Sequence, residues 1–408
     1  MTAEATSIRN WQPRPDFVAR VIRAYRLAIE SYRGQSVPRW FSFGPEAADI
    51  HAALLAGSER ARAMIADPGS SYLFYGMDNL FRDHVALASE SGEAQSGRSS
   101  IGLETLQRLA AEVCGSAPAD PEALIACLDD SLGIRVDFPN PFAGEAGLRT
   151  SRGIISYRAP QAVYQAWRLL EVCKRAGGTK VLEIGAGMGR TVYYANRLGL
   201  KDYTVVDLPA TLVGASCFLA AVLGEDAIWM LGDLPEAQAG RVRLVPPTWL
   251  NACPERFDVA LNVDSFTELR REDAERYFFD LHRRSSALLS INHENNWFRV
   301  SDMPRTLGIG VPTTRSPCAM RHGYFDEVFL FSSGKTKRSA GPLLRLRWLA
   351  LRPLSLAREM RWQRALAKLG PFLGAPPDRS DLRQDALKSK PGRPELEGAP
   401  HHTNRRRA

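Results

Sequence analysis

The stretch that decides the fold is Lys180–Asp207, KVLEIGAGMGRTVYYANRLGLKDYTVVD. An apolar run, Val181–Ile184, meets three closely spaced glycines, a helical pattern follows, and a second β-type run ends at Asp207. This order of strand, tight turn, helix and strand predicts the start of a doubly wound α/β domain, which binds its ligand at the carboxyl ends of the strands. Glycine suits the turn because a residue without a Cβ lets the backbone bend sharply and approach a ligand closely.

The spacing of the glycines separates two kinds of nucleotide site. A dinucleotide fingerprint, G-x-G-x-x-G, would need its last glycine where Arg190 stands. Gly185, Gly187 and Gly189 instead form the pattern E-x-G-x-G-x-G together with Glu183. This loop resembles the S-adenosylmethionine (SAM) loop of class I methyltransferases.

Asp207 strengthens this interpretation because it ends the second strand, where its two carboxylate oxygens could accept hydrogen bonds from both ribose hydroxyls. Leu208, which follows it, is counted with it as a cofactor-binding position. Glu183 is expected to orient the glycine loop or to approach the amino group of the cofactor. The alternative is a glycine turn in another kind of α/β protein, with Asp207 as a helix cap before Pro209.

Length and composition indicate a globular protein of more than one part. A chain of 408 residues, 45% hydrophobic and 24% charged, predicts two domains and an appendage. The sequence has no apolar run long enough to span a membrane, and its first residues lack the apolar core of a secretory signal. Its 6 cysteines form no C-x-x-C pair, which favours reduced thiols in the cytoplasm over a disulfide framework or a zinc site.

The net charge of +8 is unevenly distributed. Residues 335–408 hold 18 Lys and Arg against 6 Asp and Glu, a net +12, which leaves −4 for residues 1–334 out of the total of +8. The basic character therefore belongs to the tail and not to the predicted catalytic domain. For this reason we expect no nucleic-acid partner.

The pattern of the chain predicts five regions. Residues 1–135 form a helical accessory region with helices near 15–33, 46–55, 101–114 and 121–132, and with a polar loop at 91–100. Residues 136–153 form a loop or lid, and residues 154–335 form the methyltransferase domain. Residues 336–374 are basic amphipathic helices, and residues 375–408 are a disordered tail.

Within the predicted catalytic domain, helices and strands alternate. A helix at 210–223 is followed by two candidate third strands, 227–231 and 242–245, between which the sequence does not decide. Strands are expected at 257–263, 287–291 and 324–331, with a helix at 271–282. This alternation predicts the α/β class and is what the seven-stranded, Rossmann-like sheet of class I methyltransferases would need. With the resemblance of the glycine loop, we expect that sheet, with a helical N-terminal region and a basic C-terminal tail.

Polar residues follow several strands, where the chemistry of such folds is located. Asp233 could accept a hydrogen bond from the adenine amine, or could simply be an acid in the turn GDLP. Asn262 and Asp264 are expected where the fourth strand meets the sulfonium end of SAM. Since SAM is already activated, the enzyme must mainly align an acceptor and remove its proton.

The candidate catalytic residues are Asp264, His293 and Glu294. An unperturbed histidine pKa of about 6.5 suits a base, although a turn histidine that bonds the backbone is the alternative for His293. Asp264 and Glu294 could act as the base, orient it, or bind a divalent metal, whose presence the sequence leaves unknown.

The segments LEIGAGMGR, VVDLP, LNVDSFTEL and LSINHEN together resemble a family of sugar O-methyltransferases from bacterial polysaccharide and glycan biosynthesis. The resemblance covers roughly residues 136–331. It implies cofactor roles for Glu183, the three glycines and Asp207, and a pocket formed by Asn262, Asp264, Ser265, Glu268, Asn292 and Glu294. The family often has glutamine at position 293, so Asp264 or Glu294 ranks ahead of His293 as the base.

The resemblance implies a SAM-dependent O-methyltransferase that transfers a methyl group to a sugar hydroxyl. The alternatives are a class I methyltransferase for another small metabolite, a nucleic-acid methyltransferase suggested only by net charge, and a scaffold without catalysis. The intact glycines and Asp207 argue against the last.

The tail adds one further expectation. Residues 341–373 interleave leucine and tryptophan with arginine, a composition typical of segments that lie on anionic membranes. Helices that pack on the catalytic domain are the alternative. We therefore expect a cytoplasmic protein with possible peripheral contact at the inner face of the membrane.

Overall fold

The structure is a computed structural model that describes residues 11–33, 45–66, 68, 92–142, 147–235 and 240–331. Its helices are α1 (Pro15–Glu30), α2 (Pro45–Ala56), α3 (Glu59–Ala66), α5 (Gly92–Val113), α6 (Pro121–Leu132), α7 (Arg158–Ala176), α8 (Arg190–Arg197), α9 (Pro209–Leu223), α10 (Pro247–Ala252), α11 (Arg271–Arg284) and α12 (Met303–Thr306). Its strands are β1 (Leu148–Thr150), β2 (Gly153–Ile155), β3 (Val181–Ile184), β4 (Tyr203–Val206), β5 (Ile228–Met230), β6 (Val242–Val245), β7 (Phe257–Val263), β8 (Ser285–His293), β9 (Thr313–Pro317) and β10 (Tyr324–Leu330).

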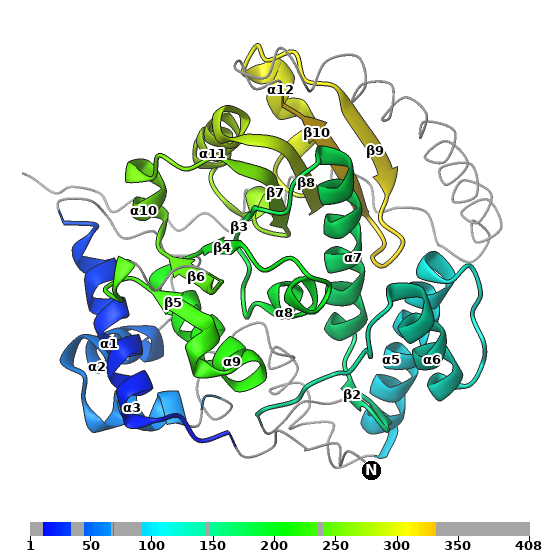
Figure 1. The fold of residues 1–408 in the computed structure, drawn as a ribbon, viewed down its shortest axis with the longest axis horizontal. Helices are drawn as coiled ribbons and strands as arrows, with labels where there is room; N and C mark the ends of the chain where they lie inside the picture. The colour runs from blue at the N-terminus through cyan, green and yellow to red at the C-terminus, as the bar shows by residue number, and fades with distance from the viewer. Residues whose placement is uncertain are drawn as a thin grey trace, which may run out of the picture. The chain divides into compact units, whose positions relative to one another are not determined.

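The central sheet confirms the predicted α/β class. Its strands lie in the order β5-β6-β4-β3-β7-β8-β10-β9 (Figure 1). The strands from β5 to β8 pair in parallel, and β10 is antiparallel to both of its neighbours. From β3 the chain adds strands in one direction and then returns to place β7 on the other side. The crevice at such a reversal, outside the carboxyl ends of the strands, is where doubly wound folds bind ligands.

In the described residues the sheet has eight strands, one more than the seven that were predicted. Both candidate third strands are present: β6 pairs with β4, and β5 pairs with β6 at the edge. The sequence left them as alternatives because both are short apolar runs. β9 was not predicted, since its sequence TTRSP is polar and contains a proline, which only an edge strand tolerates.

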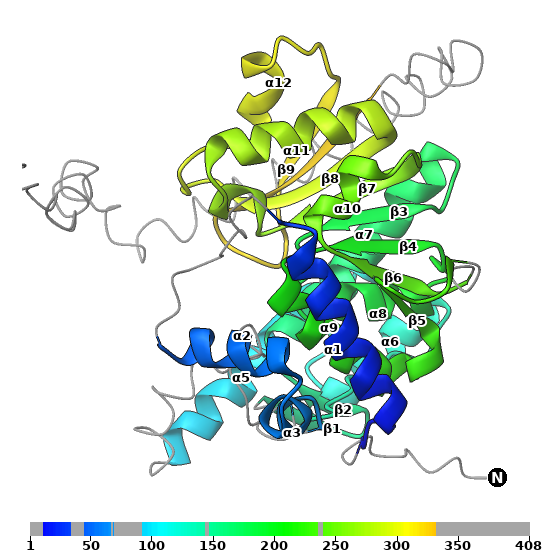
Figure 2. The ribbon, with the colours of Figure 1, turned by 90° about the vertical axis from the view of Figure 1, so that its left-hand side faces the viewer.

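Helices cover both faces of the sheet, as Figures 1 and 2 show. Alternate residues of a strand point to opposite faces, so Val181 joins a core cluster with α7, α8 and α9, whereas Leu182 joins a second cluster with α10 and α11. Both are fully buried. The strands are therefore mainly apolar in sequence, which is why β3 and β7 match their predicted bounds.

The N-terminal helices share the first of these cores. Phe17 of α1, Leu54 of α2 and Leu106 of α5 belong to the same buried cluster as the sheet. Figure 2 shows α1 beside α9. The Arg14 side chain donates to Glu225 at 2.6 Å, just before β5. The region predicted as accessory is therefore continuous with the core of the sheet.

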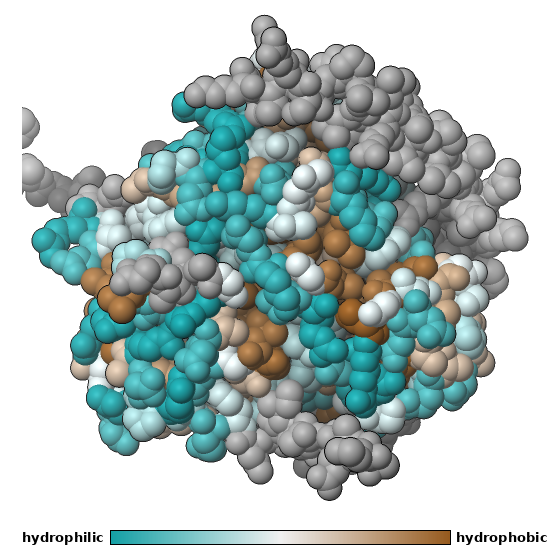
Figure 3. All heavy atoms as spheres, in the orientation of Figure 1, coloured by the Kyte–Doolittle hydropathy of each residue, from teal (hydrophilic) through white to brown (hydrophobic). Residues whose placement is uncertain are grey.

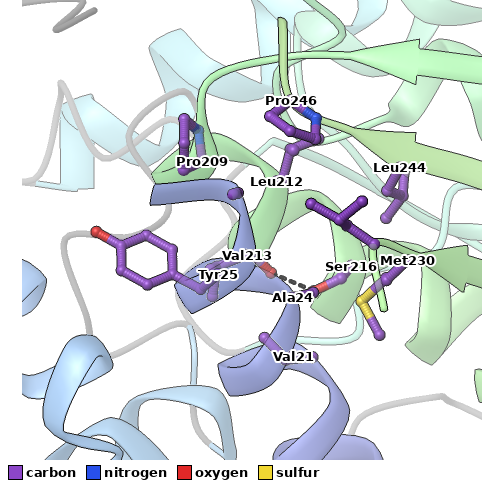
Figure 4. A pocket seen from close by; sticks show the side chains of 12 residues that line it. Val21, Ala24, Tyr25, Pro209, Leu212, Val213, Ser216, Met230, Leu244 and Pro246 are labelled. Atoms are coloured by element: carbon purple, nitrogen blue, oxygen red, sulfur yellow. Dashed lines mark hydrogen bonds between the residues drawn. The ribbon is translucent and has the colours of Figure 1, made fainter. Parts of the chain in front are cut away.

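A small pocket lies where α1 meets α9 (Figure 4). Its lining is almost wholly apolar and includes Val21, Leu212 and Met230. The hydroxyl of Ser216, which lies there, donates to the carbonyl of Val213 at 2.7 Å. The lining contains neither the glycine loop nor Asp207, and we take the pocket as imperfect packing between the two helices.

Two segments differ from their predicted local structure. Residues 92–100, predicted as a loop, are the first part of α5. The Glu-Ala-Gln sequence at 93–95 favours helix, and the helix continues into a part that buries Leu106 and Leu109. Within the predicted loop or lid, β1 and β2 pair as an antiparallel hairpin from Leu148 to Ile155.

The predicted basic helices and disordered tail, residues 336–408, lie outside the described residues. In the described part of the chain, no helix is both long enough and apolar enough to cross a membrane. The face shown in Figure 3 is largely hydrophilic where it is coloured, with hydrophobic residues gathered in separate patches.

Candidate active site

The glycine loop joins β3 to α8 at the carboxyl edge of the sheet. Gly185, Gly187 and Gly189 have φ angles of +79°, +56° and +84°, a region that favours glycine. A Cβ on Gly185 would lie 2.3 Å from Ser265 Oγ, and a Cβ on Gly189 would lie 3.0 Å from Leu219 Cδ1. A Cβ on Gly187 would meet no atom of the described residues within 4 Å. Two of the glycines are thus needed for packing, and Gly187 faces open space that a ligand can occupy.

Asp207 lies beside this loop, as predicted from its place after β4. Its Oδ2 accepts a hydrogen bond from the Gly187 N–H at 2.9 Å, and its Oδ1 accepts one from the Leu208 N–H at 2.7 Å. Burial raises the pKa of Asp207 to about 6, against the opposing effect of these hydrogen bonds. The two predicted cofactor elements, loop and acid, are therefore in contact, and Leu208 orients the carboxylate through its backbone.

Glu183 lies on β3 and is only 1% exposed. Its Oε2 accepts a hydrogen bond from the hydroxyl of Tyr203 at 2.9 Å. Burial, with a smaller contribution from the charge of Asp207, raises the pKa of Glu183 to about 8, so the group is largely neutral at pH 7. Its direct contact with the cofactor stays a prediction.

We expect Glu183→Gln to change the pH dependence of stability. Unfolding exposes a carboxyl of ordinary pKa, about 4.5, whereas the folded protein keeps the proton up to about pH 8. Between these values the unfolded state binds fewer protons, so stability falls as pH rises, by up to about 1.4 kcal/mol per unit. Glu183→Gln has no carboxyl at this position, so it lacks this loss of stability with rising pH. In urea titrations its stability relative to the unchanged protein should therefore increase from pH 5 to pH 8, and a constant difference would contradict the prediction.

Asn262 organises the loops around the glycines from a fully buried position at the end of β7. Its Nδ2 donates to the carbonyl of Ile184 at 2.9 Å and to Ser265 Oγ at 2.5 Å, and its Oδ1 accepts from Asn292 Nδ2 at 2.8 Å. These bonds tie the ends of β3, β7 and β8 together. The structure thus shows an organising role for Asn262, and its predicted contact with the cofactor is untested.

Asp233 lies in the turn after β5, where its carboxylate holds α1. Its Oδ2 accepts from Arg20 Nη2 at 2.8 Å, and its Oδ1 accepts from Arg23 Nη2 at 3.1 Å. Oδ2 also accepts from the N–H of Met230 at 3.0 Å. These contacts match the alternative of a turn acid, and the contact with the adenine amine stays a prediction.

Asp264 follows β7 beside Ser265 and is the non-glycine residue with positive φ, +61°, in the described part of the chain. Such backbone strain gathers at functional sites. Its carboxylate accepts hydrogen bonds from the hydroxyl of Tyr324, at 2.7 Å, and from the guanidinium of Arg321. Arg321 also lies over the Tyr324 ring, 3.6 Å from its centroid. Ser265, the next residue, lies against Gly185, so the backbone at Asp264 is close to the start of the glycine loop.

His293 ends β8 and packs edge-on against Tyr324, with ring centroids 5.0 Å apart. Its Nδ1 accepts from the N–H of Asn295 at 3.1 Å, which places the proton of the neutral ring on Nε2. A Cβ on Gly323 would lie 2.6 Å from Nε2. The structure therefore brings His293 and Asp264 to the same tyrosine, Tyr324. The hydrogen bond from Asn295 fits the alternative for His293, a turn histidine that bonds the backbone.

Glu294 forms ion pairs with two arginines. It pairs with Arg299 Nε at 3.0 Å and with Arg315 Nη2 at 2.8 Å, and Arg315 also binds Glu327 at 2.9 Å. Within the described ranges, no three His, Cys, Asp or Glu side chains group to hold a metal ion. The divalent metal that the sequence left open stays untested.

Sequence reasoning missed several residues of the site. Arg321 and Tyr324 hold Asp264, and Tyr277 of α11 stacks on Phe266 with centroids 6.2 Å apart. Tyr32, which follows α1, lies near Asp207, whose charge adds to the effect of burial in raising the pKa of this tyrosine. No motif marks these residues, because they reach the site from distant parts of the chain.

Comparison with known proteins gives only distant matches. No protein-family model matches the chain, and no curated protein matches it. Among solved structures, the methyltransferase domain of bacterial CtHen1-CN matches at 17% identity, with 41% of this chain and 99% of that chain covered and a TM-score of 0.31.

Two further structures match at a similar level. Magnesium protoporphyrin IX methyltransferase (ChlM) from Synechocystis PCC 6803, with bound SAM, has 14% identity, 43% and 80% coverage of the two chains, and a TM-score of 0.30. The glycopeptide N-methyltransferase MtfA has 17% identity, 41% and 90% coverage, and a TM-score of 0.30. At these TM-scores the likeness carries no inference about this chain, whose fold and site rest on its own geometry.

Proposed function

We propose that this protein is a SAM-dependent methyltransferase. The observation that carries the proposal is the contact between Asp207 and the N–H of Gly187, at the point where the order of the strands reverses. This contact joins an acid suited to ribose hydroxyls to a loop with open space at Gly187. A carboxylate and a bare glycine backbone in one crevice suit the adenosyl part of SAM.

We further propose that the acceptor is a sugar hydroxyl, nucleotide-activated or part of a glycan. The motifs around Asp264 and Glu294 support this by their resemblance to sugar O-methyltransferases. A second support is an open pocket formed by the segments after β7 and β8, whose lining includes Glu268, Arg270 and the 87% exposed Trp297. An aromatic ring beside charged side chains suits a sugar, which has apolar faces and a rim of hydroxyls.

In the proposed reaction, the hydroxyl oxygen attacks the methyl carbon of SAM while its proton passes to the protein. The carbon–sulfur bond breaks, and S-adenosylhomocysteine leaves. Asp264 is the candidate proton acceptor because the next residue, Ser265, lies against the glycine loop and because Tyr324 and Arg321 orient its carboxylate. Incubation with labelled SAM and a panel of nucleotide sugars, followed by mass analysis, tests the reaction. A methylated sugar is the expected product, whereas label on a nucleic acid alone would contradict it.

The cofactor assignment predicts that Asp207→Ala weakens SAM binding. Charged hydrogen bonds contribute about 1.5 to 3 kcal/mol, so Kd should rise about 10- to 100-fold in calorimetry. In the unchanged protein, binding should also weaken as pH falls below about 6, because the raised pKa lets Asp207 take up a proton there, which removes its charge and weakens its hydrogen bonds to ribose. The variant should lack this pH dependence. Unchanged SAM affinity in a folded Asp207→Ala protein would refute the assignment.

A further inference from the structure

A tyrosine hydroxyl of the N-terminal region is buried without a partner. Tyr32 is 4% exposed, and its hydroxyl forms no hydrogen bond with any of the residues that the structure describes. Buried hydroxyls without partners are uncommon because removing them from water costs free energy that only a new hydrogen bond restores. This hydroxyl is therefore suited to a group that arrives with a ligand.

Contacts along α1 fix where Tyr32 lies. Arg14 binds Glu225 before β5, and Arg20 binds Asp233 after β5. At the end of the helix, Ser31 Oγ lies 2.5 Å from Oγ1 of Thr248, in the helix that follows β6. The next residue, Tyr32, is thereby held at the carboxyl edge of the sheet, beside the strand that pairs with β4.

Tyr32 interacts electrostatically with Asp207, the residue that the proposed function assigns to the ribose hydroxyls. Burial and then the charge of Asp207 raise the pKa of Tyr32. The pKa of Tyr277 is raised by burial, by Tyr32 and by Asp207. The three groups therefore lie within electrostatic reach of one another, although they come from the segment after α1, the end of β4, and α11. Because Tyr32 stays neutral, its hydroxyl keeps a proton to donate.

We propose that the hydroxyl of Tyr32 donates a hydrogen bond to a ribose oxygen of the adenosyl group bound by Asp207. The N-terminal region then supplies part of the cofactor site itself. This inference rests on the proposed function, since it concerns the same cofactor. A ribose hydroxyl can donate to the carboxylate and accept from the phenol at once, so both protein groups are satisfied by one ligand group.

Tyr32→Phe tests the proposal because it removes only the hydroxyl. The expected result is an increase of about 3- to 10-fold in Kd for both SAM and S-adenosylhomocysteine, because the variant loses the stabilisation of the complex by one neutral hydrogen bond. The thermal midpoint of the ligand-free variant should be unchanged or higher, since no existing bond is lost. A loss that affects SAM alone would place the contact at the methyl-bearing sulfur and overturn the ribose assignment.

Tyr25→Phe is the matched control, on α1, the helix that precedes Tyr32. The hydroxyl of Tyr25 already pairs with His51 Nδ1 at 2.6 Å, so this variant should lower the midpoint of the ligand-free protein and leave the Kd for SAM unchanged. Unchanged affinity in Tyr32→Phe, or a lower ligand-free midpoint there, would overturn the proposal. If SAM binds the unchanged protein and Asp207→Ala weakens it, such a result refutes the role of Tyr32 alone. If SAM does not bind the unchanged protein, the proposed function itself fails.

Discussion

Gly187→Val should abolish SAM binding while the protein stays folded. The φ angle of Gly187 is +56°, and a Cβ there would project into the open space that the proposal assigns to the cofactor. Valine adds two further methyl groups to that space and disfavours the backbone conformation that presents the N–H to Asp207. Calorimetry should detect no binding at SAM concentrations that saturate the unchanged protein.

Gly177→Val is the control that separates strain from obstruction. Gly177 has a φ of +80°, and a Cβ there, as at Gly187, would meet no atom within 4 Å in the part of the chain that the structure describes. Gly177 differs in its place, because it follows α7 and precedes β3, at the amino edge of the sheet. The two variants should lose similar amounts of thermal stability, and only Gly187→Val should lose SAM. Equal SAM affinity in both would mean that the open space at Gly187 is not the cofactor site.

The elements predicted best are those whose residues are buried on both faces. β3 and β7 match their expected bounds, and β4 ends one residue before Asp207. A short, mainly apolar segment between turn residues is typical of a buried strand, so its ends can be read from the sequence. The two short strands β5 and β6 were each recognised but treated as alternatives, since nothing local shows that a sheet extends by one more strand. β9 was missed because edge strands carry polar residues and proline, as loops do.

The same distinction applies to the site. Gly187 and Asp207 were predicted together because twenty residues of strand, turn and helix fix their geometry. The partners of Asp264 could not be predicted, since Arg321 and Tyr324 lie 57 and 60 positions away and the chain has many other arginines and tyrosines. Asp233 follows the end of a strand, where ligand contacts are common. Its carboxylate instead accepts hydrogen bonds from an arginine of the neighbouring helix α1, which the sequence around Asp233 does not reveal.

Asp264→Asn should lower turnover by about 10²- to 10⁴-fold with little change in SAM affinity. General base catalysis contributes that much, and an amide of the same shape cannot accept the proton of the sugar hydroxyl. Asp264 stands out among the three candidates, since Glu294 is shared by Arg299 and Arg315, and Nδ1 of His293 is occupied by a backbone N–H. Glu294→Gln and His293→Ala should therefore lower turnover less than Asp264→Asn does.

Asp302→Asn provides the matched control, because Asp302 is also paired with an arginine, Arg305 at 3.2 Å, but lies on the surface in another segment. Its turnover should equal that of the unchanged protein.

Tyr324→Phe removes one of the hydrogen bonds that orient Asp264, so it should lower kcat more than it raises KM for the sugar. Full activity of Asp264→Asn and His293→Ala would mean that the acceptor binds elsewhere. Loss of activity on adding a chelator would instead require a metal ion in the reaction, because a carboxylate base acting alone needs none.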